Sequence, residues 1–272
     1  MQSKPLVLVV NDDGVFSPGL SAVCDSLYDC FDLLIVAPHK QQTSMGRSYP
    51  LVEDLGVLEK VKVKTEQNTF DAYSVHSSPS YAVAYAIKEL ADRKPDLCIS
   101  GINYGENLGK TITYSGTIGA AMQAADFNIP AIAISRPTDL SIIHDKSYPN
   151  LDWSLSKKII RKWALKVIKK GMPFSAPIIN INVPERTEDS DYFEYTFQSN
   201  LEMFDFKTPP QRDFNKPFVL PCDKRTNFKE AEKGSDIYAV CVDKVTSITP
   251  IECNLTFNKF ITSSKHCGWL CR

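Results

Sequence analysis

No run of apolar residues in this chain approaches the roughly 20 that an α-helix needs to cross a bilayer. The first ten residues, MQSKPLVLVV, also lack the long apolar segment and the small-residue cleavage site of a secretory signal. We therefore expect a cytoplasmic protein that has no membrane partner.

The sequence has no excess of basic residues and no zinc-finger spacing of cysteines. Lys and Arg number 31 against 32 Asp and Glu, and the net charge of −1 argues against a surface that binds nucleic acid. Because the cysteines are scattered, with no second Cys or His pair at ligand spacing, we expect reduced thiols and no structural zinc. The eight are Cys24, Cys30, Cys98, Cys222, Cys241, Cys253, Cys267 and Cys271.

The chain does have enough apolar residues, 43% of 272, to bury a sizeable core. Apolar runs followed by amphipathic segments are typical of βαβ units and a parallel sheet. We expect strands over residues 6–10, 33–37, 96–100, 131–135 and 177–184, short strands and turns between 51 and 77, and two further strands over 237–242 and 245–248. Helices are expected over residues 18–27, 79–90, 118–126 and 151–170.

These elements predict an α/β fold in three sequence segments. Residues 1–184 hold the catalytic core with its mainly parallel sheet. Residues 185–235 are polar, aromatic and interrupted by proline, so we expect loops with short β pieces that form an arm in oligomer contacts. Residues 236–272 are expected to add strands and a tail that complete the same domain, which gives the core a β-rich C-terminal extension.

The most informative motif is NDDG, Asn11 to Gly14, which directly follows the first strand. Five branched apolar residues before it are typical of a strand buried in a parallel sheet, and such sheets bind ligands at the carboxyl ends of their strands. The neighbouring carboxylates of Asp12 and Asp13 repel each other, and a hard divalent cation would relieve that repulsion and bind phosphate. A simple turn is the alternative, since Asn, Asp and Gly dominate turns.

Two further strand ends offer oxygen ligands to the same edge of the sheet. The segment HKQQTSMGRS follows the second strand and brings Thr43 or Ser44. A polar, glycine-rich segment, which we expect to leave the third strand at residue 101, brings Asn103. Hydroxyl, amide and carboxylate oxygens suit Mg²⁺, Mn²⁺ or Ca²⁺, so a divalent ion is predicted here.

A phosphate cradle is predicted where YSGTIGAA opens a helix. Ser115, Gly116 and Thr117 offer hydroxyls and free backbone N–H groups at the positive end of that helix. Asn107 could reach the same phosphate. Taken alone, the first motif could be an ordinary Ser/Thr helix cap and Asn107 an ordinary turn residue.

In their order along the chain, these segments resemble the SurE family, the survival protein E nucleotidases. The similar segments are NDDG, APHKQQTSMGRS, SGINYGENLG, YSGTIGAA, IPAIAIS, PIININVP and SITP. The resemblance implies a Rossmann-like three-layer α/β core and hydrolysis of nucleoside 5′- and 3′-monophosphates. It also implies one divalent ion per subunit, Mg²⁺ or Mn²⁺, whose place Ca²⁺ could take in a crystal, and homodimers or homotetramers assembled through C-terminal extensions.

The resemblance also assigns roles to residues of this chain. The positions that match the family's metal ligands are Asp12, Asp13, Asn103 and, as the hydroxyl ligand, Thr43 with Ser44 beside it. The positions that match its phosphate pocket are Asn107, Ser115, Gly116 and Thr117. The expected catalytic residues among them are Asp12, Asp13, Asn107 and Ser115. The chain departs from the family at His39, where Asp is usual, and at Ser77 and Tyr81, where Gly and Asp are usual, which puts its substrate range in doubt.

We therefore predict a 5′-nucleotidase in which a metal-activated water attacks the phosphorus of a nucleoside monophosphate. A non-catalytic nucleotide- or phosphate-binding protein with a decayed site is the alternative. An aspartyl-phosphate phosphatase needs a second acid two residues after its nucleophile, and Gly14 stands at that position after Asp12. The turn NDDGVFSPG also lacks the G-x-G-x-x-G pattern of dinucleotide-binding folds.

Overall fold

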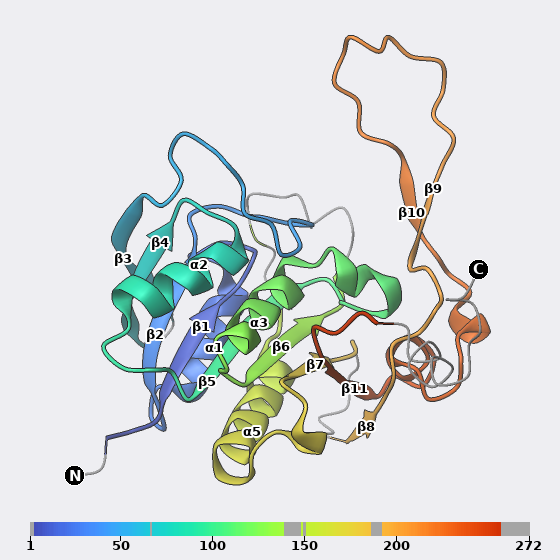
Figure 1. Ribbon diagram of the computed structural model, residues 1–272. Helices are drawn as coiled ribbons and strands as arrows, with labels where there is room; N and C mark the ends of the chain where they lie inside the picture. The colour runs from blue at the N-terminus through green and yellow to red at the C-terminus, as the bar shows by residue number, and fades with distance from the viewer. Residues whose placement is uncertain (1–2, 66, 139–147, 149–150, 186–191, 257–272) are drawn as a thin grey trace, which may run out of the picture.

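The computed structural model describes residues 3–65, 67–138, 148, 151–185 and 192–256 (Figure 1). Within them, nine strands form one sheet in the order β3-β4-β2-β1-β5-β6-β7-β11-β8, and two more form a separate β9–β10 ladder. The central pairs β4–β2, β2–β1, β1–β5, β5–β6 and β6–β7 are all parallel. The predicted α/β class with a mainly parallel sheet is confirmed.

The strands of the large sheet are β1 (Leu6–Val10), β2 (Asp32–Pro38), β3 (Leu58–Lys64), β4 (Thr69–Val75), β5 (Leu97–Tyr104), β6 (Ala131–Arg136), β7 (Ile178–Asn182), β8 (Phe193–Tyr195) and β11 (Thr246–Ile251). The smaller ladder joins β9 (Phe204–Phe206) and β10 (Cys222–Lys224). The helices are α1 (Pro18–Leu27), α2 (Pro79–Tyr85) with a π-helical continuation (Ala86–Leu90), α3 (Gly116–Asp126) and α5 (Ser154–Lys170). Short 3₁₀ turns span Gly109–Thr113, Pro173–Ser175 and Phe228–Glu230, and a π-helical turn spans Tyr238–Val242.

Helices cover both faces of the sheet, which explains the unbroken apolar run of β1 (Figure 1). Because side chains alternate along a strand, Val7 and Val9 point to one face and Leu8 and Val10 to the other. The first pair belongs to the core cluster that includes residues of α1 and α5, and the second pair belongs to the cluster of α2 and α3. All five β1 residues are buried, so packed strand residues hold the segment that leads to Asp12 and Asp13.

The helix starts follow the predicted caps. Ser17 accepts a hydrogen bond from the N–H of Gly19 at 3.2 Å, and Ser78 accepts one from Tyr81 at 3.2 Å. In both helices a proline occupies the first position, where its missing N–H costs nothing. Ser115 caps α3 through the N–H of Ile118 at 3.2 Å.

One predicted strand is wrong. Residues 237–242 form the π-helical turn Tyr238–Val242 rather than an extended segment. Ile237 and Val240 lie three residues apart, and both are buried in a small cluster with Leu108. A six-residue apolar run does not distinguish a buried strand from a buried helical turn, and here the packing favours the turn.

The third predicted strand is longer than expected. It continues past Ser100 to Tyr104, because a bulge shifts its register with β6 between Ser100 and Asn103. Gly101 has φ +135°, and a Cβ there would collide with the carbonyl oxygen of Ile134. Glycine therefore keeps the strand in the sheet here, where the sequence pattern had predicted a loop.

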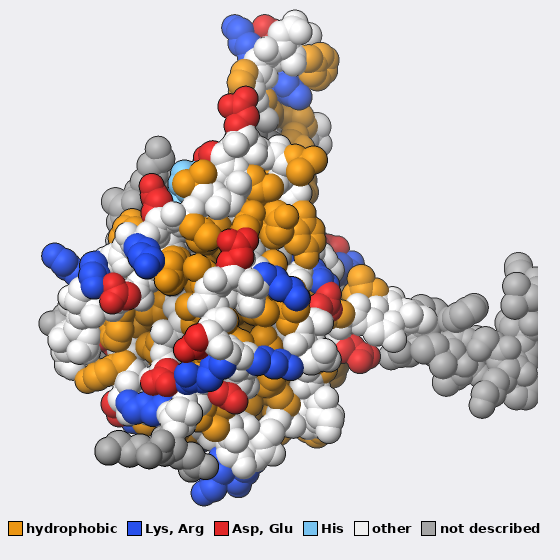
Figure 2. All heavy atoms as spheres, turned by 60° about the vertical axis from the view of Figure 1, so that its left-hand side comes forward, with side chains coloured by type: hydrophobic (Ala, Val, Ile, Leu, Met, Phe, Trp, Pro, Cys, Tyr) orange, Lys and Arg blue, Asp and Glu red, His pale blue; other side chains and the backbone are white. Residues whose placement is uncertain are grey.

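Residues 204–224 project from the body as an arm based on the β9–β10 ladder (Figure 1). In the space-filling view this projection carries hydrophobic side chains among charged and other ones (Figure 2), and Phe206, Phe214 and Val219 are exposed on it. β8 instead joins the large sheet beside β11. The three-segment division and the arm's role in oligomer contacts stay predictions, and the tail over 257–272 lies outside the described residues.

The six cysteines in the described part of the chain are free thiols. Cys24 and Cys98 are buried and Cys222 is exposed, whereas Cys267 and Cys271 lie outside the described residues. Among the helices that the structure describes, none combines the length and apolar character that a membrane span requires.

Candidate active site

The NDDG motif forms both a turn and a ligand-bearing edge. The side chain of Asn11 closes the turn on Gly14, accepting from its N–H at 3.2 Å and donating to its carbonyl oxygen at 3.1 Å. Asp12 and Asp13 lie inside this turn at the carboxyl end of β1, and the two residues are 4% and 2% exposed. The turn therefore holds two acids in the protein interior, and the two readings of the motif are compatible.

Asp12 lies against the start of α3. Its Oδ1 accepts a hydrogen bond from the Thr117 hydroxyl at 2.6 Å. A Cβ on Gly116 would lie 2.7 Å from the Cβ of Asp12, so only glycine allows the helix to approach this closely. Burial raises the pKa of Asp12 to about 6, and the Thr117 hydrogen bond lowers it in part.

Asp13 is the more strongly perturbed of the two acids. Its Oδ2 accepts from the N–H of Tyr104 at 3.2 Å, and the side chain of Gln41 also donates to its carboxylate. Burial, and then the charge of Asp12, raise the pKa of Asp13 well above its usual range. The hydrogen bonds and ion pairs of the described residues bring no Lys or Arg to either carboxylate. This uncompensated pair suits a bound cation.

The loop after β2 borders Asp12. The N–H of Gln42 donates to the carbonyl oxygen of Asp12 at 2.7 Å, so Thr43 follows a direct contact with the motif. Thr43 is half-buried, whereas Ser44 is exposed and has φ +62°. This placement favours Thr43 over Ser44 as the nearby hydroxyl, and its role as a ligand stays a prediction.

Asn103 lies beyond the bulge in β5 and is 8% exposed. Its side-chain nitrogen donates to the carbonyl oxygen of Gly105 at 2.6 Å. This bond fixes the nitrogen end of the amide, so its oxygen is the atom that Asn103 would present to a cation.

The predicted phosphate cradle divides into two kinds of donor. Ser115 caps α3, which agrees with the ordinary reading of this residue, but its hydroxyl hydrogen is still available to a ligand. Thr117 donates its hydroxyl to Asp12, so its backbone N–H is the donor left for phosphate. Together with Gly116, these residues place free N–H groups of the first helical turn beside the two acids.

Asn107 is held by a polar network that sequence reasoning missed. Its N–H donates to Asn182 Oδ1 at 2.8 Å, and its carbonyl oxygen accepts from Asn180 at 2.8 Å and from Asn182 at 3.0 Å. Its side chain donates to Ser135 Oγ at 2.8 Å. The signal was available in the strand segment PIININVP, where two Asn two residues apart point to one face of an otherwise apolar strand.

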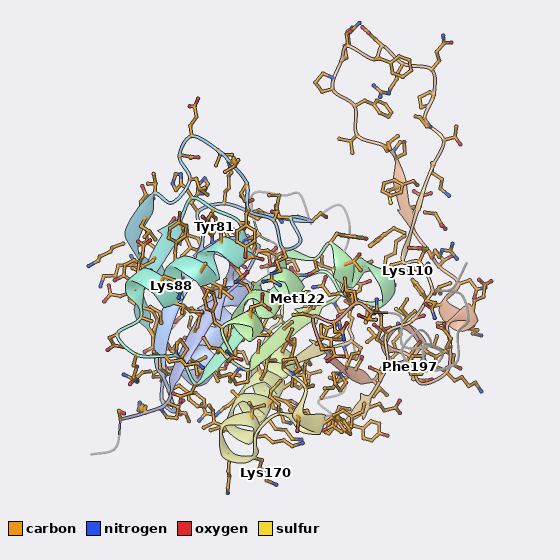
Figure 3. All side chains as sticks on the ribbon, viewed as in Figure 1. Tyr81, Lys88, Lys110, Met122, Lys170 and Phe197 are labelled. Atoms are coloured by element: carbon orange, nitrogen blue, oxygen red, sulfur yellow. The ribbon has the colours of Figure 1, made fainter. Side chains whose placement is uncertain are left out.

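The positions that depart from the family pattern lie in separate surroundings. The ring of Tyr81, at the start of α2 (Figure 3), packs against Tyr49 and Tyr85 with centroid distances of 5.0 Å each. Ser77 is buried and donates to the carbonyl oxygen of Ser78.

Comparison with known proteins follows this geometry. The family described as survival protein SurE matches residues 7–204. A protein named 5′-nucleotidase SurE from Methanosphaera stadtmanae is 33% identical over 92% of this chain and 95% of its own length. The protein of the same name from Methanosarcina acetivorans is 35% identical over 93% of each chain. A crystal structure of the SurE protein from Aquifex aeolicus superimposes with a TM-score of 0.74 at 30% identity, covering 96% of this chain and 99% of that one.

Proposed function

The chain belongs to the SurE family and is a 5′-nucleotidase, and we propose that it uses one divalent metal ion per subunit to hydrolyse nucleoside 5′- and 3′-monophosphates. The observation that carries the metal dependence is the pair of buried carboxylates, Asp12 and Asp13, that no basic side chain of the described residues neutralises. A phosphate dianion would be repelled by these acids unless a cation lay between them.

The donor set fits a hard cation. Asp12, Asp13, Asn103 and Thr43 would hold it, since all four offer oxygen atoms and Mg²⁺ and Mn²⁺ prefer oxygen ligands. Bound there, such an ion supplies a Lewis acid for a phosphoryl oxygen and lowers the pKa of a bound water.

The residues of the chain itself bind and orient the phosphate. Ser115 and the N–H groups of Gly116 and Thr117 donate to the non-bridging oxygens at the positive end of α3. Asn107 retains one amide hydrogen beyond its bond to Ser135, and the Asn180 and Asn182 contacts keep its backbone fixed. These donors are in place before substrate arrives, so little reorganisation is needed as charge develops.

Two rival readings are less well supported. A decayed binding site would have no need to keep the Thr117 contact to Asp12 or the buried network around Asn107. An aspartyl-phosphate mechanism lacks its second acid, because Gly14 stands two residues after Asp12. Trapping a phosphorylated Asp12 would favour that mechanism over ours.

The decisive experiment is hydrolysis of a panel of 5′- and 3′-nucleoside monophosphates with Mg²⁺, Mn²⁺ or a chelator. We expect turnover with a divalent ion, its loss with the chelator, and its loss in Asp13→Asn. An Asp13→Asn protein with full metal-dependent activity would contradict the proposed site. Absence of turnover with every ion and nucleotide, but with retained nucleotide binding, would instead support the binding-protein reading.

We also propose that the arm assembles homodimers or homotetramers. Its support is the exposure of large apolar side chains on a projecting ladder, since Phe214 is 85% exposed and Phe206 is 74% exposed. The mass of the full chain in solution, measured by light scattering, should be a multiple of the 30.5 kDa monomer. Phe206→Asp should lower this mass, and an unchanged mass would show that the arm does not form the oligomer contacts. The cytoplasmic location stays a prediction.

A further inference from the structure

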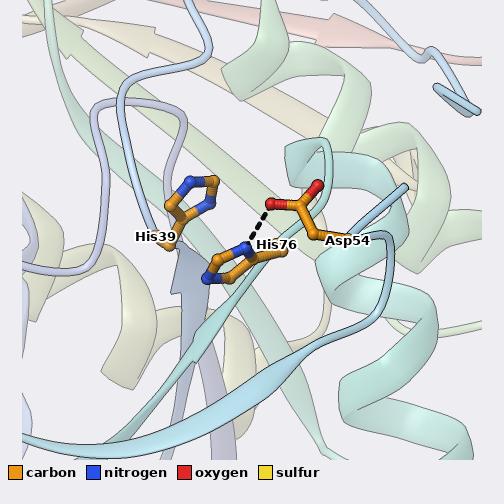
Figure 4. A group of neighbouring side chains, drawn as sticks. All are labelled: His39, Asp54 and His76. Carbon is orange, nitrogen blue, oxygen red and sulfur yellow. Dashed lines mark hydrogen bonds and ion pairs between the residues drawn. The ribbon is translucent and has the colours of Figure 1, made fainter. Parts of the chain in front are cut away.

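A second group of metal-binding side chains lies at the neighbouring strand ends. His39 follows β2, His76 follows β4, and Asp54 comes from the turn before β3 (Figure 4). One ligand atom from each of the three lies within 4.8 Å of the others. A backbone hydrogen bond holds the two histidines next to each other. The N–H of His39 donates to the carbonyl oxygen of Val75, the residue directly before His76, at 2.9 Å.

We propose that His39, Asp54 and His76 form a second metal site, which binds late first-row ions such as Zn²⁺ or Co²⁺ and leaves a fourth position open. Two imidazoles and one carboxylate are typical ligands of such ions, whereas Mg²⁺ prefers oxygen atoms alone. The oxygen ligands around Asp12 and this cluster would therefore select different metals. The proposal does not depend on the nucleotidase reaction.

The state of the two imidazoles supports binding. Nδ1 of His39 is buried and has no hydrogen-bond partner among the described residues, which is costly for a polar atom unless a ligand satisfies it. His76 Nδ1 lies 2.6 Å from Asp54 Oδ2, so these two groups already meet.

The geometry also shows what must move. The two rings are stacked with centroids 3.8 Å apart and planes 11° apart, and parallel rings cannot both direct a lone pair at one ion. Bonds of about 2.0–2.1 Å to a tetrahedral ion place its ligand atoms roughly 3.4 Å apart. One ring must therefore rotate, and the 2.6 Å contact between His76 Nδ1 and Asp54 Oδ2 must open to that spacing. The Asp54 side chain is 53% exposed in a turn, so solvent rather than packed protein surrounds most of the path.

The test uses the full chain, stripped of metal and then held in excess Mg²⁺ so that the oxygen-ligand site is occupied. Titration with Co²⁺ should produce the strong visible absorption of a low-coordinate, nitrogen-bound ion. His39→Ala and His76→Ala should each weaken Co²⁺ binding by at least about tenfold, and Asp54→Asn should weaken it less severely. Asp213→Asn, at an exposed acid of the arm, is the matched control for Asp54→Asn and should leave the titration unchanged.

Asp12→Asn separates this site from the proposed nucleotidase site. It should abolish hydrolysis but keep the Co²⁺ absorption, whereas His39→Ala should lose the absorption. Zn²⁺ should raise the thermal midpoint of the wild type and leave that of His76→Gln unchanged, because a ligand is missing. A cooperative melting transition of His76→Gln without Zn²⁺ shows that the variant still folds. The proposal is overturned if both histidine variants keep the Co²⁺ absorption, or if the absorption disappears only with Asp12→Asn. His39, Asp54 and His76 would then form only a hydrogen-bonded pair, Asp54 with His76, beside the stacked ring of His39.

Discussion

Replacing Asp12 with Asn should stabilise the metal-free protein while removing its activity. Asp12 is only 4% exposed, and burial raises the pKa of its carboxyl from 3.8 to about 6. The folded protein thus binds this proton more tightly than the unfolded chain, so stability from this group is greatest at low pH and is lost as the pH rises through about 6. The difference between the two pKa values corresponds to roughly 3 kcal/mol of folding free energy.

The amide in Asp12→Asn has the size of the carboxyl and no charge to desolvate, and its oxygen can still accept from Thr117. At about pH 8 the free energy of unfolding of the metal-free variant should exceed that of wild type by up to about 3 kcal/mol. Near pH 4 the wild-type carboxyl is largely protonated in the fold, and the difference should shrink towards zero. Loss of the Asp12 charge also removes one cause of the raised pKa of Asp13, which adds to the gain.

Urea denaturation with a chelator at both pH values measures the effect. Adding Mn²⁺ at about 100 times its dissociation constant should stabilise wild type by about 2.7 kcal/mol and the variant by much less, so the gap narrows or reverses. The reasoning fails if Asp12→Asn is the less stable protein at high pH without metal. It also fails if the difference between the two proteins is the same at both pH values.

Three further substitutions test the contacts around the two acids. Thr117→Val removes the hydroxyl that donates to Asp12 at 2.6 Å and should lower metal-dependent kcat/KM roughly 10- to 100-fold, whereas Thr117→Ser should keep most of the activity. Gly116→Ala introduces a Cβ 2.7 Å from that of Asp12, so α3 must shift. A displacement near 1 Å should lower kcat about 100-fold, and melting curves should show that the variant is still folded. Asn182→Ala removes two bonds to the backbone of Asn107 and should raise KM for nucleotides and cost about 1–3 kcal/mol of stability, measured by steady-state kinetics and urea denaturation.

Local signals in the sequence were enough for most of the fold. The unbroken apolar run of β1 predicted a strand covered on both faces, and α1/α5 and α2/α3 do cover it. The Ser-Pro pairs at Ser17 and Ser78 predicted two helix starts, because cap chemistry is decided within four residues. The ordered motifs predicted the SurE family and a 5′-nucleotidase, and the comparisons confirm both.

What the sequence did not reveal depends on packing between distant segments. The six apolar residues over 237–242 fit a strand as well as a helical turn, so the predicted strand is wrong there. Packing of Ile237 and Val240 with Leu108 stabilises the turn. The continuation of β5 past Ser100 required a backbone approach between Gly101 and Ile134, which no local pattern encodes. Each miss arose where a tertiary contact outweighed the local preference.

The active-site edge shows the same division between local and distant causes. NDDG was open to two readings because Asn11 does form a turn, yet that turn is what holds Asp12 and Asp13 at the end of a buried strand. The partners that set their chemistry come from far along the chain: Thr117 lies 105 residues after Asp12, and Asn182 lies 75 residues after the Asn107 that it holds. A sequence motif can therefore identify the groups that meet a ligand. The residues that fix their position and pKa become visible only when the sheet has brought its strand ends together.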